Sequence, residues 1–281
     1  MNGRFLGCRE TEAGAQAVLL GLPLDATGCG RAGVKDAPAA IRQASQFLEE
    51  YSLPLRADLR EVGVYDALDL PLPPGNLLGA LKAIEDEAQQ VLAAGHPLLA
   101  LGGEHLVTLP LVRAAAARSP DLRVLQLDAH ADLAPHYGGE PLTHATVMRR
   151  VVEQVGAGRL VQAGIRSGTA EEVAFAEANT LWFDPRTPAG LDAMLRALRG
   201  HPVYVTIDID VLDPAFAPGV STPEPGGWST MEALAVLSAL SDLEVVALDL
   251  VEVCPPVDAG GVTAVAAARL LRDAAIIFFR P

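Results

Sequence analysis

The stretch "LQLDAHADLAP", residues 125–135, begins as a buried strand and ends in three polar side chains. Alternate residues of an extended chain point to the same side, so we expect Asp128, His130 and Asp132 on one side. Two carboxylates and an imidazole, with no Lys or Arg among them, require a counter-charge because uncompensated buried charge is costly. The stretch therefore predicts a buried strand with a cation at its end.

Apolar runs of strand length alternate along the chain with Ala- and Leu-rich stretches of helical spacing. The expected strands are 16–21, 61–65, 97–101, 122–127, 159–164, 180–183, 203–209 and 244–252. The expected helices are 37–49, 76–94, 106–117, 143–155, 169–178, 187–199, 230–240 and 262–273, followed by a terminal strand "AAIIFF" at 274–279. This alternation predicts an α/β fold with a mainly parallel sheet of about eight strands, covered by helices on both faces. With no linker or repeat in view, we expect one domain over residues 1–281, with ligands at the carboxyl ends of the strands.

The charge balance bears on the partners of this chain. It carries 35 acidic and 21 basic residues, for a formal net charge of −14. That excess of negative charge disfavours nucleic acid and anionic membranes as partners and suits a cationic substrate. The apolar runs fall short of the roughly 18 residues that span a membrane, and "MNGRFLGCRE" lacks the apolar core of a secretion signal. Three scattered cysteines indicate reduced thiols, so we expect a cytoplasmic protein.

A second expected strand also ends in carboxylates. In "VYVTIDIDVLDP", 203–214, Asp208 and Asp210 share one side of the extended chain. Asp213 falls outside this alternation and precedes a proline, so we interpret it as a turn residue. Because parallel strands end at the same edge of a sheet, these carboxylates are expected near those of the first stretch.

Two more strand ends supply an imidazole and a carboxylate. In "LLALGGEHLVTLP", 98–110, a Gly-Gly turn precedes His105, which opens a helix at the sheet edge. In "VALDLVEVCPP", 246–256, Glu252 follows an apolar strand that contains Asp249. We expect a functional role for Glu252 because it lies at a strand end, beside the other polar strand ends.

Taken together, these strand ends provide four carboxylates, two imidazoles and no thiolate. The expected metal ligands are His105, Asp128, His130, Asp132, Asp208 and Asp210. Six ligands exceed the needs of one tetrahedral zinc, and His is a poor calcium ligand. Oxygen-rich ligation with some imidazole favours manganese, with cobalt or nickel as substitutes. Two divalent cations would balance four carboxylates and, about 3.5 Å apart, would activate a bridging hydroxide.

The motifs "GGEH", "DAHADL", "DIDVLDPAFAPG" and "VEVCPP", in this order, resemble the arginase/agmatinase (ureohydrolase) superfamily. The similarity extends from "GVKDAPAAIR" to the final helix. The resemblance implies a three-layer α/β/α domain, a dimanganese centre that hydrolyses guanidino groups to urea and an amine, and a homo-oligomer, either trimer or hexamer.

The same resemblance implies a role for each residue at this site. One manganese would be held by His105, Asp128, Asp132 and Asp208, and the other by Asp128, His130, Asp208 and Asp210, so that Asp128 and Asp208 bridge the ions. Glu252 would bind the guanidinium group of the substrate, since a planar cation needs an anionic bidentate partner. Asp210 would pass a proton to the leaving amine, and His144 would lie near the substrate as a proton shuttle.

The loop after the "DAH" motif bears on the substrate. Arginases resemble one another in an Asn- and Ser-containing loop there, whereas "LAPHYGGEPLTHATVMRR" lacks it and looks more like the agmatinase branch, as do "GIRSGTAEE" and "TPEPGG". Agmatine, with no carboxylate, is therefore the expected substrate, yielding putrescine and urea. The alternatives are guanidinobutyrate, aminopropylagmatine, arginine and formimidoylglutamate, and, from another class, a non-catalytic metal-binding homologue. His136, in the same loop, is expected to border the pocket, whereas His96 and His201 are expected at the surface.

Overall fold

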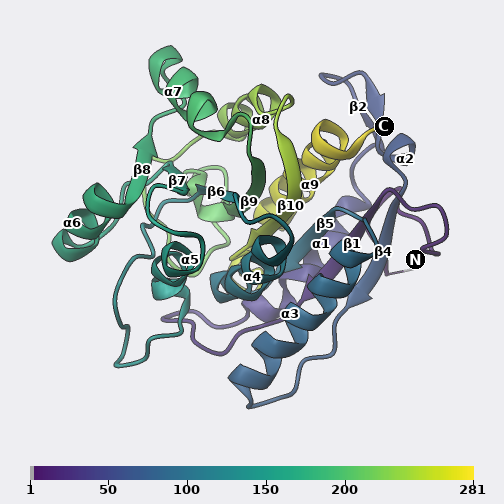
Figure 1. Cartoon of the computed structure of the whole chain (residues 1–281). Coiled ribbons are helices and arrows are strands. Elements are labelled where there is room, and N and C mark those ends of the chain that lie inside the picture. Colours follow the sequence, from purple (N-terminus) through teal and green to yellow (C-terminus); the bar gives the residue numbers. More distant parts are fainter. Residues whose placement is uncertain (1–2) are drawn as a thin grey trace.

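Eight strands form one sheet in which every pairing is parallel (Figure 1). The computed structural model describes residues 3–281 of the chain. The strands are β1 (Ala17–Leu22), β4 (Val64–Asp69), β5 (Leu98–Gly102), β6 (Arg123–Leu127), β7 (Leu160–Ala163), β8 (Thr180–Phe183), β9 (Pro202–Asp208) and β10 (Glu244–Val251). The predicted α/β fold class is confirmed.

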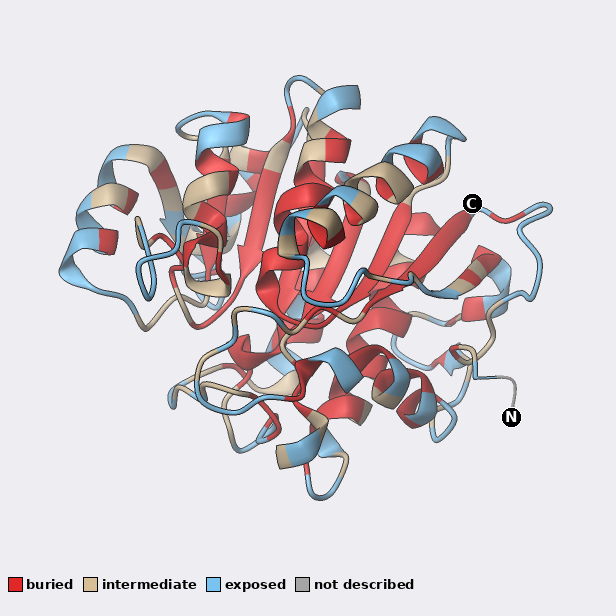
Figure 2. Ribbon diagram, turned by 90° about the horizontal axis from the view of Figure 1, so that it is seen from below, coloured by how far each residue is buried: buried red, intermediate tan, exposed pale blue. Residues whose placement is uncertain are grey.

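Helices cover both faces of the sheet and make it the middle of three layers. One face packs against α3 (Leu77–Ala93), α4 (Thr108–Arg118), α5 (Val147–Val155) and α6 (Ala170–Asn179). The other packs against α1 (Ala37–Ser45), α2 (Leu59–Val62), α7 (Pro188–Leu198), α8 (Thr230–Ala239) and α9 (Val262–Phe279). Successive strand residues serve opposite layers: Leu99 and Leu101 pack on the α9 side, and Leu98 and Ala100 on the α3 side. Figure 2 shows the resulting buried sheet between partly exposed helices.

The sheet order explains why four strand ends can form one site. The order is β4-β1-β5-β10-β9-β6-β7-β8. The four strands whose ends carry the predicted polar residues, β5, β10, β9 and β6, are therefore immediate neighbours in the centre. β5 and β6 follow each other along the chain but lie on opposite sides of β10 and β9. Ligands of open parallel sheets bind at such a reversal of strand order.

The expectation of a strand at 274–279 is wrong, because α9 runs without interruption from Val262 to Phe279. Leu270, Leu271, Ala274 and Ala275 are all buried. Their four-residue spacing keeps one helical face against the core, and this outweighs the strand preference of the Ile-Ile-Phe-Phe run. Among the described residues, no helix is both long enough and apolar enough to cross a membrane.

The strand expected at 61–65 begins later, because Leu59–Val62 form the short helix α2. Gly63 ends that helix in the left-handed conformation, with φ at 68°, and β4 follows directly. A two-residue antiparallel pair, β2 (Tyr51–Ser52) with β3 (Ala57–Asp58), has no counterpart among the expected elements.

Candidate metal centre and active site

The acidic side chains reach one another through turns that follow the strands. The expectation that strand alternation continues to Asp132 is wrong, because β6 ends at Leu127. Asp132 instead has φ at 54°, a left-handed conformation that non-glycine residues rarely adopt. Asp210 likewise lies beyond its strand, in the 3₁₀ helix η4 (Ile209–Val211), where its backbone N–H donates to Asp208 Oδ1 at 2.9 Å. The left-handed backbone of Asp132 is strained, and strain of this kind is concentrated at functional sites.

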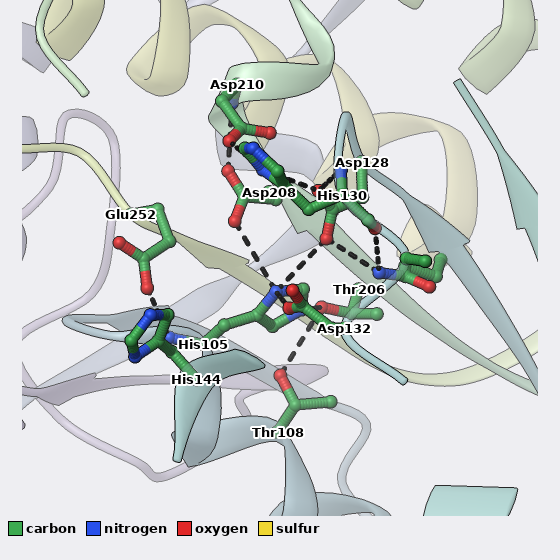
Figure 3. Close-up of polar contacts among 12 residues, drawn as sticks. His105, Thr108, Asp128, His130, Asp132, His144, Thr206, Asp208, Asp210 and Glu252 are labelled. Atoms are coloured by element: carbon green, nitrogen blue, oxygen red, sulfur yellow. Dashed lines mark hydrogen bonds and ion pairs between the residues drawn. The ribbon is translucent and has the colours of Figure 1, made fainter. Parts of the chain in front are cut away.

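Three carboxylates surround one nitrogen of His105 (Figure 3). From His105 Nδ1, the nearest oxygen of Asp132 lies at 3.1 Å, that of Asp128 at 3.2 Å and that of Asp208 at 3.4 Å. His105 opens the 3₁₀ helix η2 (His105–Val107) at the end of β5 and is 1 % exposed. The structure thus brings residues from β5, β6 and β9 to one point.

A second group adjoins the first and shares a residue with it. Potential ligand atoms of Asp128, His130 and Asp210 lie within 4.8 Å of one another, as do those of His105, Asp128 and Asp132. His130 Nδ1 lies 2.9 Å from Asp210 and 3.9 Å from Asp128. Asp128 is the residue common to both groups. Asp208 belongs to neither, although it contacts His105 and accepts the Asp210 N–H.

The electrostatics of the cluster call for additional positive charge. Burial and the neighbouring Asp210 and Asp132 raise the pKa of Asp128 to about 7. Burial, Asp210 and Asp128 raise the pKa of Asp208 well above its usual value. Although burial opposes it, the hydrogen bond to Asp210 raises the pKa of His130 to about 10. The cluster on its own therefore retains protons at neutral pH, and cations can take their place.

The donor set fits divalent cations. His105 Nδ1 is buried and makes no hydrogen bond, although three carboxylates surround it. One N–H could satisfy only one of these carboxylates, whereas a lone pair can share a cation with all three. His105 Nε2 lies 3.0 Å from Thr206 Oγ1. The Thr206 hydroxyl itself donates a hydrogen bond to Asp249 at 2.6 Å. The His105 Nε2–H must therefore donate to Thr206, which leaves Nδ1 free to bind metal.

Asp249 anchors this arrangement from inside β10. It is fully buried and accepts hydrogen bonds from Tyr204, Thr206 and Thr108 at 2.5–2.8 Å. Asp249 was expected within a strand, with no role predicted for it. The sequence feature that could have indicated this role is a carboxylate within an otherwise apolar strand, because a buried carboxylate needs hydrogen-bond partners.

Glu252 faces the cluster from the end of β10. Its backbone has φ at 68°, and its N–H donates to Gly103 O at 2.9 Å. Its Oε1 accepts the backbone N–H of His105 at 2.7 Å. Burial raises the pKa of Glu252 to about 8. The carboxylate of Glu252 is therefore bound by His105, the residue whose ring belongs to the candidate metal cluster.

His144 lies at the start of the 3₁₀ helix η3 (His144–Thr146), beside two residues for which the sequence predicted no role. Thr27 Oγ1 lies 3.4 Å from His144 Nδ1, and Cys29 Sγ lies 3.4 Å from His144 Nε2. Tyr137 packs edge-on against the imidazole at 5.3 Å between ring centroids. No sequence signal within the 23–33 segment pointed to this contact, because it joins residues more than 100 positions apart.

The other selected residues lie outside the cluster. Asp213 accepts backbone N–H groups of Ala215, Gly226 and Gly227 and so organises a turn. His136 is exposed, and His96 and His201 are half-buried. A pocket of 590 Å³ opens next to the His144 loop, lined by residues that include Thr27, Leu78, Tyr137 and Glu140.

A carboxylate-rich, imidazole-containing cluster at the central strand ends of an α/β sheet is typical of metal-dependent hydrolases. Comparison with known proteins indicates the family within this class of hydrolases. The arginase family model matches residues 15–277. An agmatinase from Bacillus anthracis is 45% identical over 92% of this chain and 90% of its own, and an agmatinase from Bacillus subtilis is 41% identical over 98% and 96%. The crystal structure of the agmatine ureohydrolase of Thermoplasma volcanium superposes with a TM-score of 0.89 at 32% identity, covering 99% of this chain and 94% of that one.

The chain belongs to the arginase family. The predicted family resemblance and the assignment as a hydrolase are thereby confirmed.

Proposed function

We propose that this chain is a ureohydrolase that cleaves agmatine to putrescine and urea. The observation that carries the proposal is the pair of ligand groups that share Asp128, with Glu252 tied to the backbone of His105 beside them. The similarity to agmatinases over nearly the whole chain supports the choice of substrate.

The cofactor in this proposal is a pair of Mn²⁺ ions. The six predicted ligands would hold them: His105, Asp128, His130, Asp132, Asp208 and Asp210. The oxygen-rich donor set with two imidazoles favours manganese over zinc. When bound, such ions make water nucleophilic at neutral pH.

The protein side chains supply binding, orientation and proton transfer. Glu252 pairs with the guanidinium and orients its carbon toward the cluster, since a carboxylate can accept two parallel N–H groups. Asp210 accepts a proton at its carboxylate and delivers it to the leaving amine. His144 carries protons between this site and solvent.

The loop that follows the cluster supports a substrate without a carboxylate. The two arginines that follow this loop, at the start of α5, are engaged elsewhere: Arg149 donates to Leu133 O and lies over the Phe175 ring, and Arg150 binds Pro135 O and Glu153. No free cation in this loop is therefore available to bind the α-carboxylate of an amino acid. The net charge of −14 also favours a dicationic substrate such as agmatine.

The proposal includes a cytoplasmic homo-oligomer, either trimer or hexamer. Two large apolar side chains, Phe47 and Leu53, are 81 % and 80 % exposed on the single chain. Surfaces of this kind are often covered by another subunit.

Release of urea by the manganese-loaded protein tests the function. The panel comprises agmatine, arginine, guanidinobutyrate and aminopropylagmatine, with formamide release measured from formimidoylglutamate. We expect the highest kcat/KM with agmatine. Asp192→Asn, a change at an exposed carboxylate, serves as the matched control and should leave the rate unchanged. Turnover of none of these compounds would overturn the enzymatic proposal, and preference for another would overturn the substrate.

A further inference from the structure

A short chain of hydrogen bonds joins Glu104 to His144 through Thr27. Thr27 lies in the segment after β1, Glu104 directly precedes η2, and His144 opens η3. The backbone N–H and the hydroxyl of Thr27 both donate to Glu104 Oε2, at 2.7 Å and 2.9 Å. The backbone N–H of His144 donates to Thr27 Oγ1 at 3.1 Å, and His144 Nδ1 lies 3.4 Å from the same oxygen. Thr27 thus connects three loops that are distant in sequence.

The hydroxyl of Thr27 can donate only one hydrogen bond, and Glu104 accepts it. A hydroxyl offers one donor and two acceptor positions. Donation to a carboxylate at 2.9 Å is stronger than donation to a neutral imidazole at 3.4 Å. Both acceptor positions then remain for His144, one for its backbone N–H and one for its ring. The ring nitrogen that faces Thr27 must therefore carry the hydrogen.

This assignment determines the state of the other ring nitrogen. With Nδ1 protonated, the neutral imidazole bears its lone pair at Nε2. Cys29 Sγ lies 3.4 Å from Nε2, where a thiol is a weak donor to that lone pair. The edge-on contact with Tyr137 further limits rotation of the ring. The contacts with Thr27 and Cys29 agree with one tautomer, and the contact with Tyr137 helps to fix the ring orientation.

Glu104 is suited to hold Thr27 in place. Its side chain is fully buried, and within the described part of the chain its Oε1 has no hydrogen-bond partner. The two bonds from Thr27 are therefore the principal compensation for burying this carboxylate, and breaking them is costly. Because Glu104 also precedes His105 in the chain, the anchor of Thr27 is fixed to the same turn as the metal cluster.

We propose that Thr27 is a positioning residue that selects the Nδ1–H tautomer of His144 and leaves Nε2 as the nitrogen that accepts a proton. The proposal rests on the proposed function in that it treats His144 as the proton carrier. Thr27 itself touches no reacting atom in this scheme and acts through the imidazole.

The test compares Thr27→Val with Thr27→Ser. Valine keeps the shape of the side chain but can neither donate nor accept, whereas serine restores the hydroxyl. We expect Thr27→Val to lower kcat about tenfold, as the loss of one positioning hydrogen bond would. We expect KM and metal content to stay unchanged and Thr27→Ser to retain wild-type kcat. A drop in metal content, or an equal loss of kcat in Thr27→Val and Thr27→Ser, would show a structural role and overturn the proposal.

A spectroscopic measurement tests the same proposal without relying on activity. Long-range ¹H–¹⁵N correlation spectra of the metal-free protein, recorded above the usual His pKa of about 6.5, report which ring nitrogen is protonated. The His144 signals are those lost in His144→Asn. We expect Nδ1–H in the wild type and in Thr27→Ser, and a mixture of tautomers in Thr27→Val. An Nε2–H form in the wild type would overturn the proposal, whichever variants fold.

The two readouts separate the two proposals. If the wild type releases no urea from any guanidino compound while its spectrum shows Nδ1–H, the proposed function fails and the tautomer assignment stands. If agmatine is hydrolysed but Thr27→Val keeps both its rate and its tautomer, the positioning role fails and the function stands.

Discussion

The backbone N–H of His105 donates to Oε1 of Glu252 across 2.7 Å. One residue therefore contacts both parts of the proposed site: its ring faces the carboxylates of the proposed metal cluster, and its main chain binds the carboxylate proposed to bind the guanidinium. The backbone of Glu252 has φ at 68°, in the left-handed region. Such a conformation persists only when its surroundings hold it, so the backbone fixes the position of Glu252 relative to His105.

Glu252→Gln should separate substrate binding from metal binding. Glutamine keeps an acceptor for the His105 N–H but removes the charge that pairs with the guanidinium. We expect unchanged manganese content and a fall in kcat/KM of about 100-fold, in line with the loss of a charge-assisted hydrogen bond. The measurements are steady-state kinetics with agmatine and metal analysis of the same sample. Glu244→Gln, at the exposed first residue of β10, is the control. Unaltered kcat/KM would remove Glu252 from the active site.

Asp128→Asn should abolish activity and lower metal content. Asp128 belongs to both ligand groups, and its two oxygens already accept from Gln126 Nε2 and the His130 N–H at 2.6 Å each. Asparagine has one oxygen for these donors and carries no charge, so both metal positions are weakened. Elemental analysis and isothermal titration with Mn²⁺ should show the loss, which Asp192→Asn should not. Retention of two equivalents of manganese would contradict the bridging role.

Metal uptake should release protons and strengthen with pH. The pKa values of Asp128, about 7, and His130, about 10, are raised in the metal-free cluster, so these groups hold protons near neutrality. Cations must displace those protons, which makes affinity increase as the pH rises toward the raised pKa values. Titration in buffers of different ionisation enthalpy measures the number of protons released. Affinity that is independent of pH between 6 and 8 (about one unit either side of neutrality) would argue against metal binding at this cluster.

Tyr204→Phe should destabilise the fold without changing its packing. The Tyr204 hydroxyl donates to the buried Asp249 at 2.5 Å, and both residues are fully buried. Removing one donor from a buried carboxylate should lower the free energy of unfolding by about 2 kcal/mol. Urea denaturation of the metal-free protein measures this, with Tyr51→Phe at an exposed position as the control. A loss below about 0.5 kcal/mol would show that the remaining two donors satisfy Asp249.

The central sheet and its polar strand ends could be predicted because both depend on short-range patterns. Strand-length apolar runs located seven strands of the sheet to within one residue and β4 only in part, and the parallel arrangement brings their carboxyl ends together. The same reasoning failed at Asp132, where a left-handed turn replaces alternation, and at 274–279, where helical spacing outweighs local strand preference.

The contacts around His144 and Asp249 could not be predicted in the same way. Thr27 meets His144 across 117 positions, and Thr108 meets Asp249 across 141. Neither pair has a periodic signature, because each depends on how loops or strands from distant parts of the chain are placed. A hydroxyl in a loop or strand is commonplace in sequence, and only its three-dimensional partners distinguish it.

The insertion of β10 between β5 and β9 has a consequence for how the protein matures. Residues 105 to 210 contain every predicted metal ligand, yet in the sheet β5 and β9 are joined only through β10, the strand at 244–251. During synthesis, the growing chain therefore contains all its ligands well before it can hold them in place. We therefore expect metal capture to wait for β10, and any change that slows the addition of β10 to the sheet should delay the appearance of metal-loaded protein.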